Sequence, residues 1–595
     1  MNKLLIIGGA SFDTLHLQNE TANTVGGAGM YTALAAARCG ADVSIFGPRP
    51  EPCPEPLQPV AARLSEWLGP AISPAELPQF EISYYQGETE YIKVELDAEK
   101  MLTPALLPAD LSEYDLVHIT PIGDAQGQLP FVQACRQRGA KLISAGTGLF
   151  IAAEKPQTVR AVVEQSDYFF MNEQEATAVF GSLEAAGTAP GKLLYITLGA
   201  RGACIIQGDT STCIAAVPTG TLDPTGAGDT FCGAALAYLL RKEHPIMAAR
   251  GAAALAAEMI TQVGPTALLS TDPAPQILLD PRVKVNEAQV CEIAAQIAAL
   301  PEAVPFPFIS RELPPENHPQ TIDYFFAATL QQFSFWSTKN GRYHLPLIAT
   351  LGGTRLKGSD YLWQAYLQAI KLDPAFCSPD RQAKLSRADM LQLYRADDGT
   401  DPMPALDLHW QQAKQYGRDM LALGLTPQVI LDHALASPEP LQTFIDLLDQ
   451  IGGYKEDPFR KKSSLLAMIL NQRPEHFLPF REDEEIAPVV DYHALRSSLR
   501  MGLVDIVDDE LAVKIQKRQI VAPGQEWAVR FAVYRAIEQL AALSGKSMGA
   551  VDWFLFSARH YCPEMSEPQC ERCLVDPICA HRKELFQPVI RTTFY

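Results

Sequence analysis

Asp223-Pro-Thr-Gly-Ala-Gly-Asp229, which runs into the apolar stretch that begins at Thr230, is the most informative segment of this chain of 595 residues. Glycines allow backbone N–H groups to crowd around an anion, and the alanine-rich continuation predicts a helix whose positive N-terminal end faces the same charge. The final aspartate adds a fixed carboxylate. No Gly-Lys-Ser/Thr follows, so the segment departs from the Walker pattern of phosphate-binding loops. These features indicate a phosphoryl-transfer site of another kind.

This segment resembles the signature of the PfkB, or ribokinase-like, family of sugar and nucleoside kinases. The resemblance implies that Asp229 is the catalytic base that takes a proton from the substrate hydroxyl, with ATP and Mg²⁺ as cofactors. It also implies that Asp223 and Thr225 align with a monovalent-cation site, for which K⁺ is the candidate. The nucleotide is then expected against Thr225, Gly226, Ala227 and Gly228.

The N-terminal residues resemble the sugar-binding part of the same family. Leu4-Leu-Ile-Ile-Gly-Gly predicts a buried opening strand and is too short for a signal peptide. By the resemblance, Asp13 binds sugar hydroxyls, and Gly26 and Gly27 let the chain pass close to the sugar. Tyr31 stands where ribokinases have an asparagine, and a phenol cannot reproduce the paired donor and acceptor of an amide. We therefore expect a substrate larger than ribose, with a ring on which Tyr31 can stack.

Two further strand-to-loop segments follow the family order. Asn172 and Glu175 form an Asn-x-x-Glu element after an apolar strand, and the resemblance places them in the magnesium and phosphate region. Thr197, Gly199 and Gly202 follow another apolar strand, in the part that the family uses around the nucleotide. These motifs span roughly residues 1–270, which predicts one large α/β domain of ribokinase-like fold.

The composition favours an intracellular enzyme that acts on a small molecule. The chain is 47% hydrophobic and carries a net charge of −20, which disfavours nucleic acid as the principal ligand because such binding draws on clustered Lys and Arg. The sequence has no run of about 18 apolar residues, so we expect no membrane span. The chain has twelve cysteines and no secretory signal. We therefore expect the cysteines to be free thiols or metal ligands and not to form a disulfide framework. We expect a cytoplasmic protein, and a homodimer is left open.

The residue composition changes after the first domain. Prolines recur between residues 265 and 307 around one helical stretch, which predicts a linker over residues 271–284. Beyond it, apolar residues recur at three-to-four spacing, which predicts a mainly α-helical domain over residues 285–595. The helices are expected near residues 285–300, 361–371, 411–423, 440–451, 462–470, 504–516 and 526–543.

The second half carries its own resemblance, on motifs that occur in one order. They are Phe333-Ser-Phe335-Trp336-Ser337, Arg395, Asp491-Tyr492, Glu526 with Arg530, Asp552-Trp553 and Phe594-Tyr595. Together they resemble the queuosine salvage family, the queuosine-nucleotide N-glycosylases. The resemblance implies an all-helical fold related to helix-hairpin-helix DNA glycosylases. It also implies cleavage of the N-glycosidic bond of queuosine 5'-monophosphate to release queuine.

Asp491 aligns with the catalytic aspartate of that family. A carboxylate against the ribose would stabilise the positive charge that develops as the bond breaks. Asp491 also precedes an amphipathic stretch, so a role as a helix N-cap is the alternative. Phe333, Phe335, Trp336 and Tyr492 could sandwich a planar base, although aromatic clusters are more often core. The remaining substrate candidates are Asp552, and Arg395, Lys461 and Lys462 as phosphate contacts.

Four cysteines near the end of the chain have the spacing of a metal site. They are Cys562, Cys570, Cys573 and Cys579. Their spacing resembles that of the cluster loop of endonuclease III-like glycosylases, except that the gap between Cys562 and Cys570 is one residue longer. We therefore expect a [4Fe–4S] cluster, with Zn²⁺ as the alternative, because both take four thiolates.

The two resemblances combine into one hypothesis. A nucleoside kinase would make the 5'-monophosphate that the glycosylase consumes, so the small-molecule partners are a nucleoside and its 5'-monophosphate. Three alternatives remain open: a pair of activities for another modified nucleoside, a DNA-repair glycosylase, and a kinase whose helical domain binds a nucleotide without catalysis.

Overall fold

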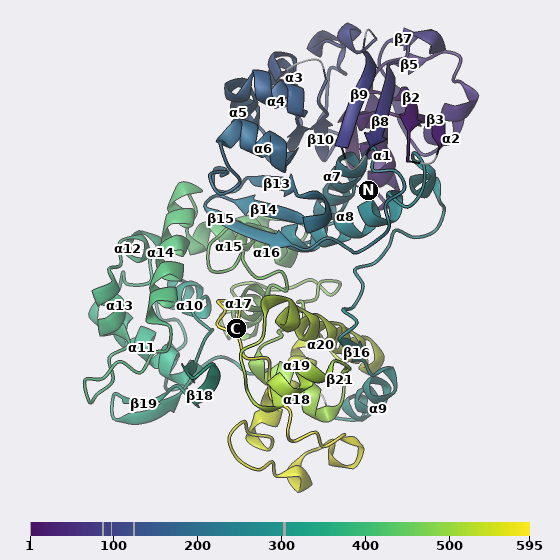
Figure 1. Ribbon diagram of the computed structural model, residues 1–595. Coiled ribbons are helices and arrows are strands. Elements are labelled where there is room, and N and C mark those ends of the chain that lie inside the picture. Colours follow the sequence, from purple (N-terminus) through teal and green to yellow (C-terminus); the bar gives the residue numbers. More distant parts are fainter. Residues whose placement is uncertain (1, 19, 86–87, 97, 123–124, 302–304) are drawn as a thin grey trace. The chain divides into compact units, whose positions relative to one another are not determined.

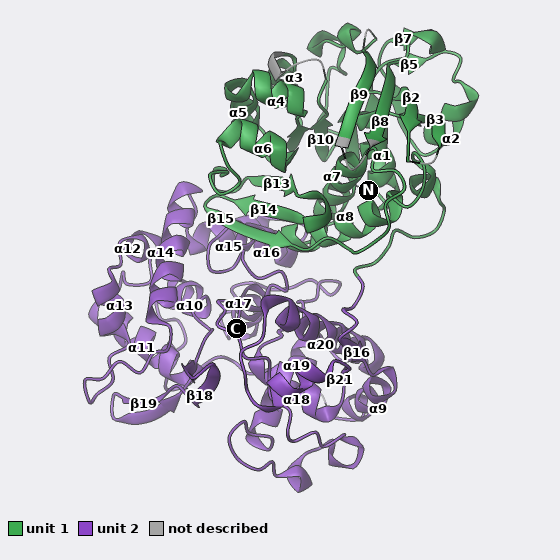
Figure 2. Cartoon of the chain, in the orientation of Figure 1, with its two compact units in different colours: residues 1–277 green, residues 278–595 purple. Residues whose placement is uncertain are grey.

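The computed structural model describes residues 2–18, 20–85, 88–96, 98–122, 125–301 and 305–595. The chain divides into two compact units, residues 1–277 and residues 278–595, which are coloured separately in Figure 2. Residues 278–284, which the sequence assigns to a linker, fall in the second unit, where Val283–Val285 forms a strand.

The first unit is built on a twisted sheet covered by helices (Figure 1). In its described part the sheet has nine strands, and the pairs from β6 to β13 are parallel, whereas β13, β14 and β15 pair antiparallel. In spatial order the strands are β15 (Thr210–Ile214), β14 (Ala203–Gln207), β13 (Leu193–Thr197), β12 (Tyr168–Asn172), β11 (Ile143–Gly146), β10 (Leu116–Ile119), β1 (Lys3–Ile7), β4 (Asp42–Phe46) and β6 (Glu66–Leu68).

Helices bury both faces of this sheet, which is why its central strands are apolar throughout. Alternate residues of β1 belong to two separate cores: Leu4 and Ile6 pack with one set of helices, and Leu5 and Ile7 with the other. The first set is α1 (Ala28–Arg38), α7 (Ala227–Leu240) and α8 (Pro245–Met259). The second is α3 (Ala125–Gln137), α4 (Leu149–Glu154), α5 (Pro156–Gln165) and α6 (Glu173–Phe180). The predicted α/β fold of the N-terminal region is confirmed.

A second, smaller sheet stands apart from the main one. Its strands in spatial order are β3 (Thr21–Gly26), β2 (Ser11–His16), β8 (Gln79–Tyr85) and β9 (Glu88–Glu95). This sheet carries Asp13 on β2 and Gly26 at the end of β3.

The second unit is rich in helices, as the sequence predicts. They are α9 (Glu287–Ala298), α10 (Thr321–Thr329), α11 (Ser359–Leu372), α12 (Pro379–Ala383), α13 (Arg387–Leu393), α14 (Leu406–Ala422), α15 (Pro427–Ala436), α16 (Pro440–Leu448), α17 (Lys461–Gln472), α18 (Tyr492–Met501), α19 (Asp509–Gln516), α20 (Pro523–Ser544) and α21 (Met548–Ser557).

Short strands interrupt this helical pattern in two places. Residues 504–516, expected as one helix, begin as β21 (Val504–Ile506), which pairs with β16 (Val283–Val285) before α19 starts. Two hairpins precede α11, and their strands are β17 (Trp336–Lys339), β18 (Arg342–Pro346), β19 (Ile348–Leu351) and β20 (Thr354–Lys357). Periodicity missed these strands because each is only three to five residues long.

The structure bears on two predictions, one about membrane spans and one about the cysteines. None of the helices in the described ranges is long and apolar enough to span a bilayer. Cys204 and Cys213, expected as thiols, face each other across β14 and β15 and are joined as a disulfide.

Candidate functional sites

The glycine-rich turn leads directly into α7, as expected for an anion site. Gly226 is the N-cap of this helix and has a φ of 74°, a conformation that favours glycine. Ala227 and Gly228 form the first turn, and Asp229 follows one residue later. Backbone N–H groups at this end have no partner within the helix, so they are available to a phosphate.

Tyr31 lies beneath the turn and does not face open space. Its side chain is 1% exposed, and a Cβ atom built on Gly226 would stand 2.5 Å from ring atom Cδ2. The ring therefore packs against the turn backbone, which leaves little of it for a substrate base. The expected stacking of Tyr31 on substrate is corrected accordingly: its position supports the phosphate turn.

Asp223 fixes the start of the same turn. It is fully buried, and its Oδ1 accepts a hydrogen bond from the backbone N–H of Thr225 at 2.9 Å. Its Oδ2 accepts from the N–H of Gly264 at 2.8 Å. Thr225 Oγ1 in turn lies 2.8 Å from the hydroxyl of Tyr84 on β8, so the smaller sheet reaches the phosphate turn. Buried oxygen atoms grouped in this way suit a monovalent cation.

Asp229 lies in the first turn of α7, directly after the glycine-rich turn. Burial raises the pKa of its carboxyl to about 6, which still leaves it mostly ionised at neutral pH. Glu175 is 6% exposed, and burial together with the charge of Asp229 raises its pKa to about 7. Asn172 holds Glu175 in a capping box: its N–H and its Nδ2 donate to the two carboxylate oxygens at 2.8 and 2.9 Å. The structure thus brings Glu175 and Asp229 within electrostatic reach of each other.

Asp13 and Gly26 fit together closely. A Cβ atom on Gly26 would stand 1.7 Å from Oδ2 of Asp13, so only glycine leaves room for this carboxylate. Ser11 Oγ donates to Oδ1 at 2.6 Å, yet burial raises the pKa of Asp13 to about 6. Gly27 has a φ of 101° and its Cβ would stand 2.7 Å from the carbonyl oxygen of Gly9. Both glycines therefore bring backbone close to the predicted sugar site.

The remaining predicted nucleotide contacts lie at the ends of β13 and β14. Thr197 pairs with Asn172 across β13 and β12, which places it beside the Asn172–Glu175 element. A Cβ atom built on Gly199 would meet open space. Gly202 does not: a Cβ there would stand 1.9 Å from the carbonyl oxygen of Ile214, so strand packing alone explains this glycine.

Glu99 is a residue that the sequence did not single out. Its Oε1 would lie 3.7 Å from a Cβ on Gly9, beside the predicted sugar site, and burial raises its pKa to about 7. No motif surrounds it, so sequence alone gave no signal for this acid.

In the second unit, several predicted residues meet at one cavity of about 330 Å³. This volume is at the lower end of the range for small-molecule sites. The cavity is lined mainly by aromatic and charged side chains, which include Phe335, Asp360, Trp363, Lys461, Asp491, Tyr492, Asp552, Trp553, Phe556 and Arg559, and the amide side chain of Gln332 also lines it.

Asp491 serves as a helix cap and also lines this cavity. Its Oδ1 accepts hydrogen bonds from the N–H groups of His493 and Ala494, both at 2.8 Å, at the start of α18. In the described part of the chain no donor reaches its Oδ2. The two interpretations of the sequence are therefore compatible, because capping uses one oxygen and leaves the second for a ligand.

Asp552 and Lys461 complete a charged group with Asp491. Burial, and then the charge of Asp491, raises the pKa of Asp552 well above its usual value. Burial lowers the pKa of Lys461 to about 8, although Asp491 favours its charged form. Its Nζ donates to the carbonyl oxygen of Gln332 at 3.0 Å. The cavity thus combines the two acidic side chains of Asp491 and Asp552 with the basic side chain of Lys461.

Other predicted substrate residues lie outside the cavity. Phe333 is fully buried and stacks on His409 at 4.2 Å, and Trp336 packs between Tyr343 and Phe586. Of the Phe-x-Phe-Trp run, only Phe335 lines the cavity.

Arg395 and Lys462, which were predicted as phosphate contacts, also lie outside the cavity lining. Arg395 is exposed on the surface. Lys462 is buried, donates to the carbonyl oxygen of Leu330 and lies over the ring of Phe333.

The predicted substrate residues did not include Trp363, Trp553, Gln332 or Arg559, although Trp553 belongs to the Asp552-Trp553 motif. The amide Nε2 of Gln332 is buried at the cavity, and no hydrogen-bond partner for it is found among the described residues. Arg559 lies over the ring of Phe556, 3.6 Å from its centroid. Arg559 follows Asp552 by seven residues, two helical turns, so helical spacing was the signal that could have found it.

The four predicted metal ligands surround a smaller cavity of about 40 Å³. Cys562, Cys570, Cys573 and Cys579 all line it, and the charges of the other three thiols help to raise the pKa of Cys579, after burial. Two N–H groups point at the sulfurs: Arg500 Nη1 lies 3.3 Å from Sγ of Cys562, and the N–H of His581 lies 3.4 Å from Sγ of Cys579.

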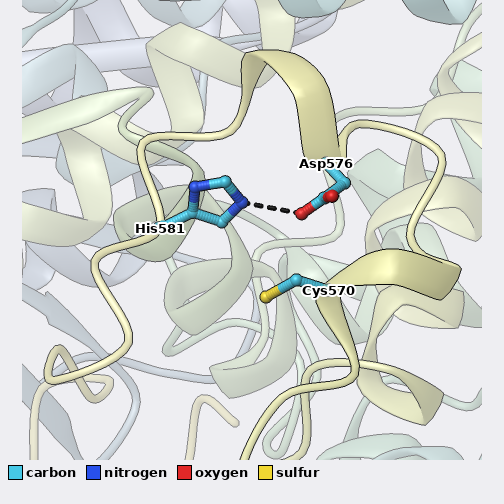
Figure 3. Close-up of side chains that lie close together, drawn as sticks. All are labelled: Cys570, Asp576 and His581. Atoms are coloured by element: carbon cyan, nitrogen blue, oxygen red, sulfur yellow. Dashed lines mark hydrogen bonds and ion pairs between the residues drawn. The ribbon is translucent and has the colours of Figure 1, made fainter.

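Figure 3 shows a second ligand set at the same place. Ligand atoms of Cys570, Asp576 and His581 lie within 4.8 Å of one another, with a 2.8 Å bond between His581 Nε2 and Asp576 Oδ1. Four clustered thiols that receive N–H donors fit an iron–sulfur cluster, and the mixed set of Cys, Asp and His fits zinc.

Residues 84–272 match the pfkB family of carbohydrate kinases. A cytidine kinase of Thermococcus kodakarensis is 24% identical over 246 residues, which cover 40% of this chain and 88% of the relative. The solved nucleoside kinase of Burkholderia thailandensis, in complex with inosine, is 22% identical, with a TM-score of 0.38 and coverage of 46% of this chain and 95% of the other. Aminoimidazole riboside kinase from Salmonella enterica is 20% identical, with a TM-score of 0.38 and coverage of 46% and 97%. The first unit therefore contains a PfkB-family kinase domain.

Proposed function

We propose that this protein is a bifunctional nucleoside salvage enzyme. Residues 1–270 phosphorylate queuosine, or a related 7-deazaguanine nucleoside, at its 5'-hydroxyl with ATP and Mg²⁺. Residues 285–595, which follow the linker 271–284, hydrolyse the N-glycosidic bond of the 5'-monophosphate to queuine and ribose 5-phosphate. The observation that carries the proposal is the meeting of Asp491, Asp552 and Lys461 with aromatic rings at one cavity.

In the kinase step, Asp229 accepts the proton of the 5'-hydroxyl. The hydroxyl oxygen forms a bond to the γ-phosphorus of ATP as the bond from that phosphorus to the β,γ-bridging oxygen breaks and ADP leaves. The N–H groups at the start of α7 stabilise the negative charge on the transferred phosphoryl group. Asp13 binds the ribose hydroxyls. Asn172 and Glu175 are placed to organise Mg²⁺, which neutralises phosphate charge when bound. The cytidine kinase relative favours a nucleoside over a free sugar.

In the hydrolytic step, we assign different roles to the two acids of the cavity. Asp491 is the carboxylate: its Oδ2 faces the ribose, stabilises the developing positive charge and accepts a proton from the attacking water. The water oxygen forms a bond to C1' as the bond from C1' to the base nitrogen breaks. Asp552 gives its proton to the departing base, which its raised pKa favours.

The rest of the cavity matches the parts of a nucleotide. The rings of Phe335, Tyr492 and Trp553 offer apolar faces to a planar base. Lys461 and Arg559 are cations for the 5'-phosphate, and the unpaired amide of Gln332 can donate to the ribose or the base. This set accounts for a preference for the phosphorylated nucleoside over the free one.

The cysteine site is proposed to hold a [4Fe–4S] cluster, with Zn²⁺ as the alternative. The group would be structural: it would tie together the loop from Cys562 to Cys579, because a bound metal contributes folding energy directly. Arg500 and the N–H of His581 would stabilise the negative charge on the thiolates.

A nucleoside panel tests this function. The purified protein is incubated with queuosine, 7-deazaguanosine, cytidine and inosine, with ATP and Mg²⁺, and mass spectrometry measures both the monophosphate and the free base. We expect base release from the 7-deazaguanine nucleosides. Monophosphate that accumulates from every nucleoside without any free base would reject the hydrolytic half and would favour a helical domain that only binds the nucleotide.

A further inference from the structure

We infer that a buried group of four residues, Asp457, Glu526, Arg530 and Tyr595, positions the reactive end of the hydrolase cavity. We call it the Arg530 cluster. None of its four members is among the described residues that line the cavity, so they are positioning residues and do not contact substrate. The inference rests on the proposed hydrolysis.

Arg530 is held in one orientation inside the second unit. It is fully buried, and its Nη1 and Nη2 donate to the two oxygens of Asp457, both at 2.8 Å. The guanidinium lies 4.9 Å from the ring centroid of Phe459 and 4.9 Å from that of Tyr595. Glu526, one helical turn earlier, is 4.0 Å from Nε. A planar, bidentate cation enclosed in this way has little freedom to rotate.

Three hydrogen bonds lead from the cluster either to a residue that lines the cavity or to the residue before one. Nε of Arg530 donates to the carbonyl oxygen of Val490 at 3.3 Å, and Val490 precedes Asp491. Oδ2 of Asp457 accepts from the N–H of Lys461 at 3.0 Å.

The third bond starts at Tyr595, whose backbone oxygen accepts from the N–H of Ser334 at 3.1 Å. Ser334 precedes Phe335. Asp491, Lys461 and Phe335 come from segments far apart in the sequence, and all three line the cavity.

This convergence has a mechanistic consequence. Buried ion pairs contribute little net stability, because desolvation offsets much of their attraction, but they can fix geometry. Displacement of a reacting group by about 1 Å can cost about 100-fold in rate. The cluster also holds the backbone at Lys461 and next to Phe335, which contact the nucleotide, but the chemical step at Asp491 tolerates the least displacement. We therefore expect the cluster to affect the chemical step more than nucleotide binding.

The test substitutes Arg530→Lys and measures base release from a preformed nucleoside 5'-monophosphate, without ATP. One ammonium group cannot keep both bonds to Asp457 and the bond to Val490. We expect kcat to fall about 100-fold while KM changes less than about threefold, and kinase turnover to stay at the parental value. The matched control is Arg535→Lys on the same helix, where the arginine is exposed and pairs with Glu538 at 2.8 Å.

A second variant covers the case in which Arg530→Lys does not fold. Arg530→Met combined with Asp457→Leu and Glu526→Gln removes the cation together with both of its acids, which avoids an unpaired buried ion. Circular dichroism and thermal melting establish its fold, and we expect the same loss of kcat.

Parental kcat in either folded variant would overturn the inference, as would an equal loss in Arg535→Lys. If the parental protein itself releases no base from the monophosphate, the proposed hydrolysis fails, and the positioning role fails with it. Parental hydrolysis that the Arg530 variants retain would reject the positioning role alone.

Discussion

The ring of Tyr31 lies directly against Gly226, so that a Cβ atom on this glycine would stand 2.5 Å from ring carbons Cδ2 and Cγ. This contact connects α1 to the turn that starts α7. The glycine-rich turn thereby packs against a buried aromatic ring, and its shape depends on the absence of a side chain at one position.

Gly226→Ala should therefore destroy the kinase activity. The substitution adds a clash with Tyr31 to the cost of a positive φ, which is about 1–3 kcal/mol for a residue other than glycine. We expect loss of ADP formation and a lower melting temperature. Gly220→Ala is the control, because a Cβ there meets open space. A Gly226→Ala protein with parental turnover would show that the turn does not bind the phosphates in this conformation.

Kinase activity should fall in acid. Asp229 must be ionised to accept a proton, and burial raises its pKa to about 6; Glu175 beside it has a pKa of about 7. The kcat/KM of phosphorylation should therefore be constant above about pH 7 and decrease as the pH falls through about 6. Because the two acids interact, the apparent pKa belongs to the pair. A rate that stays constant down to about pH 5 would exclude Asp229 as the base.

Asp491→Asn should stop base release without unfolding the second unit. Asparagine caps a helix as well as aspartate does, so the bonds to His493 and Ala494 can persist, but the amide cannot accept a proton from water. We expect a loss of about 100-fold or more, with monophosphate accumulating in the presence of ATP.

Asp508→Asn is the matched control, since Asp508 caps α19 through a 2.7 Å bond from the N–H of Leu511 and lies outside the cavity lining. Parental base release by Asp491→Asn would mean that another group provides the catalytic carboxylate.

Cys573→Ser should remove the bound metal. We expect iron or zinc content by mass spectrometry to fall, and the melting transition of the second unit to shift to lower temperature, because metal binding contributes folding energy. Cys291→Ser, at an exposed cysteine outside the site, should retain the parental metal content. Equal metal content in the two variants, or none in the parental protein, would contradict a four-cysteine site.

The sequence predicts those parts of the molecule that local patterns govern. The glycine turn before α7 and the strand at Leu4 required only short motifs, and helical periodicity located α11, α14, α16, α17 and α20. The strand β21 and the hairpins before α11 escaped because their pairing depends on partners elsewhere in the chain, such as Val283–Val285.

Site residues were predictable where a motif places them, and much less so where only tertiary packing does. Asp491, Tyr492, Asp552 and Phe335, which the second resemblance names as site residues, line one cavity, and their roles there stay predictions. Phe333 and Trp336 do not, since their positions within the run direct their rings toward His409 and Phe586. Sequence could not show that Tyr31 supports the turn, because that contact joins α1 to residues almost two hundred positions later.

The most direct test of the two-step account measures queuine released from queuosine with and without ATP, by the parental protein and by Asp229→Asn. The account predicts release by the parental protein only with ATP, about 100-fold or more slower release by Asp229→Asn, and equal release by both proteins from queuosine 5'-monophosphate without ATP. Queuine release from queuosine that is independent of ATP, or unaffected by Asp229→Asn, would contradict it.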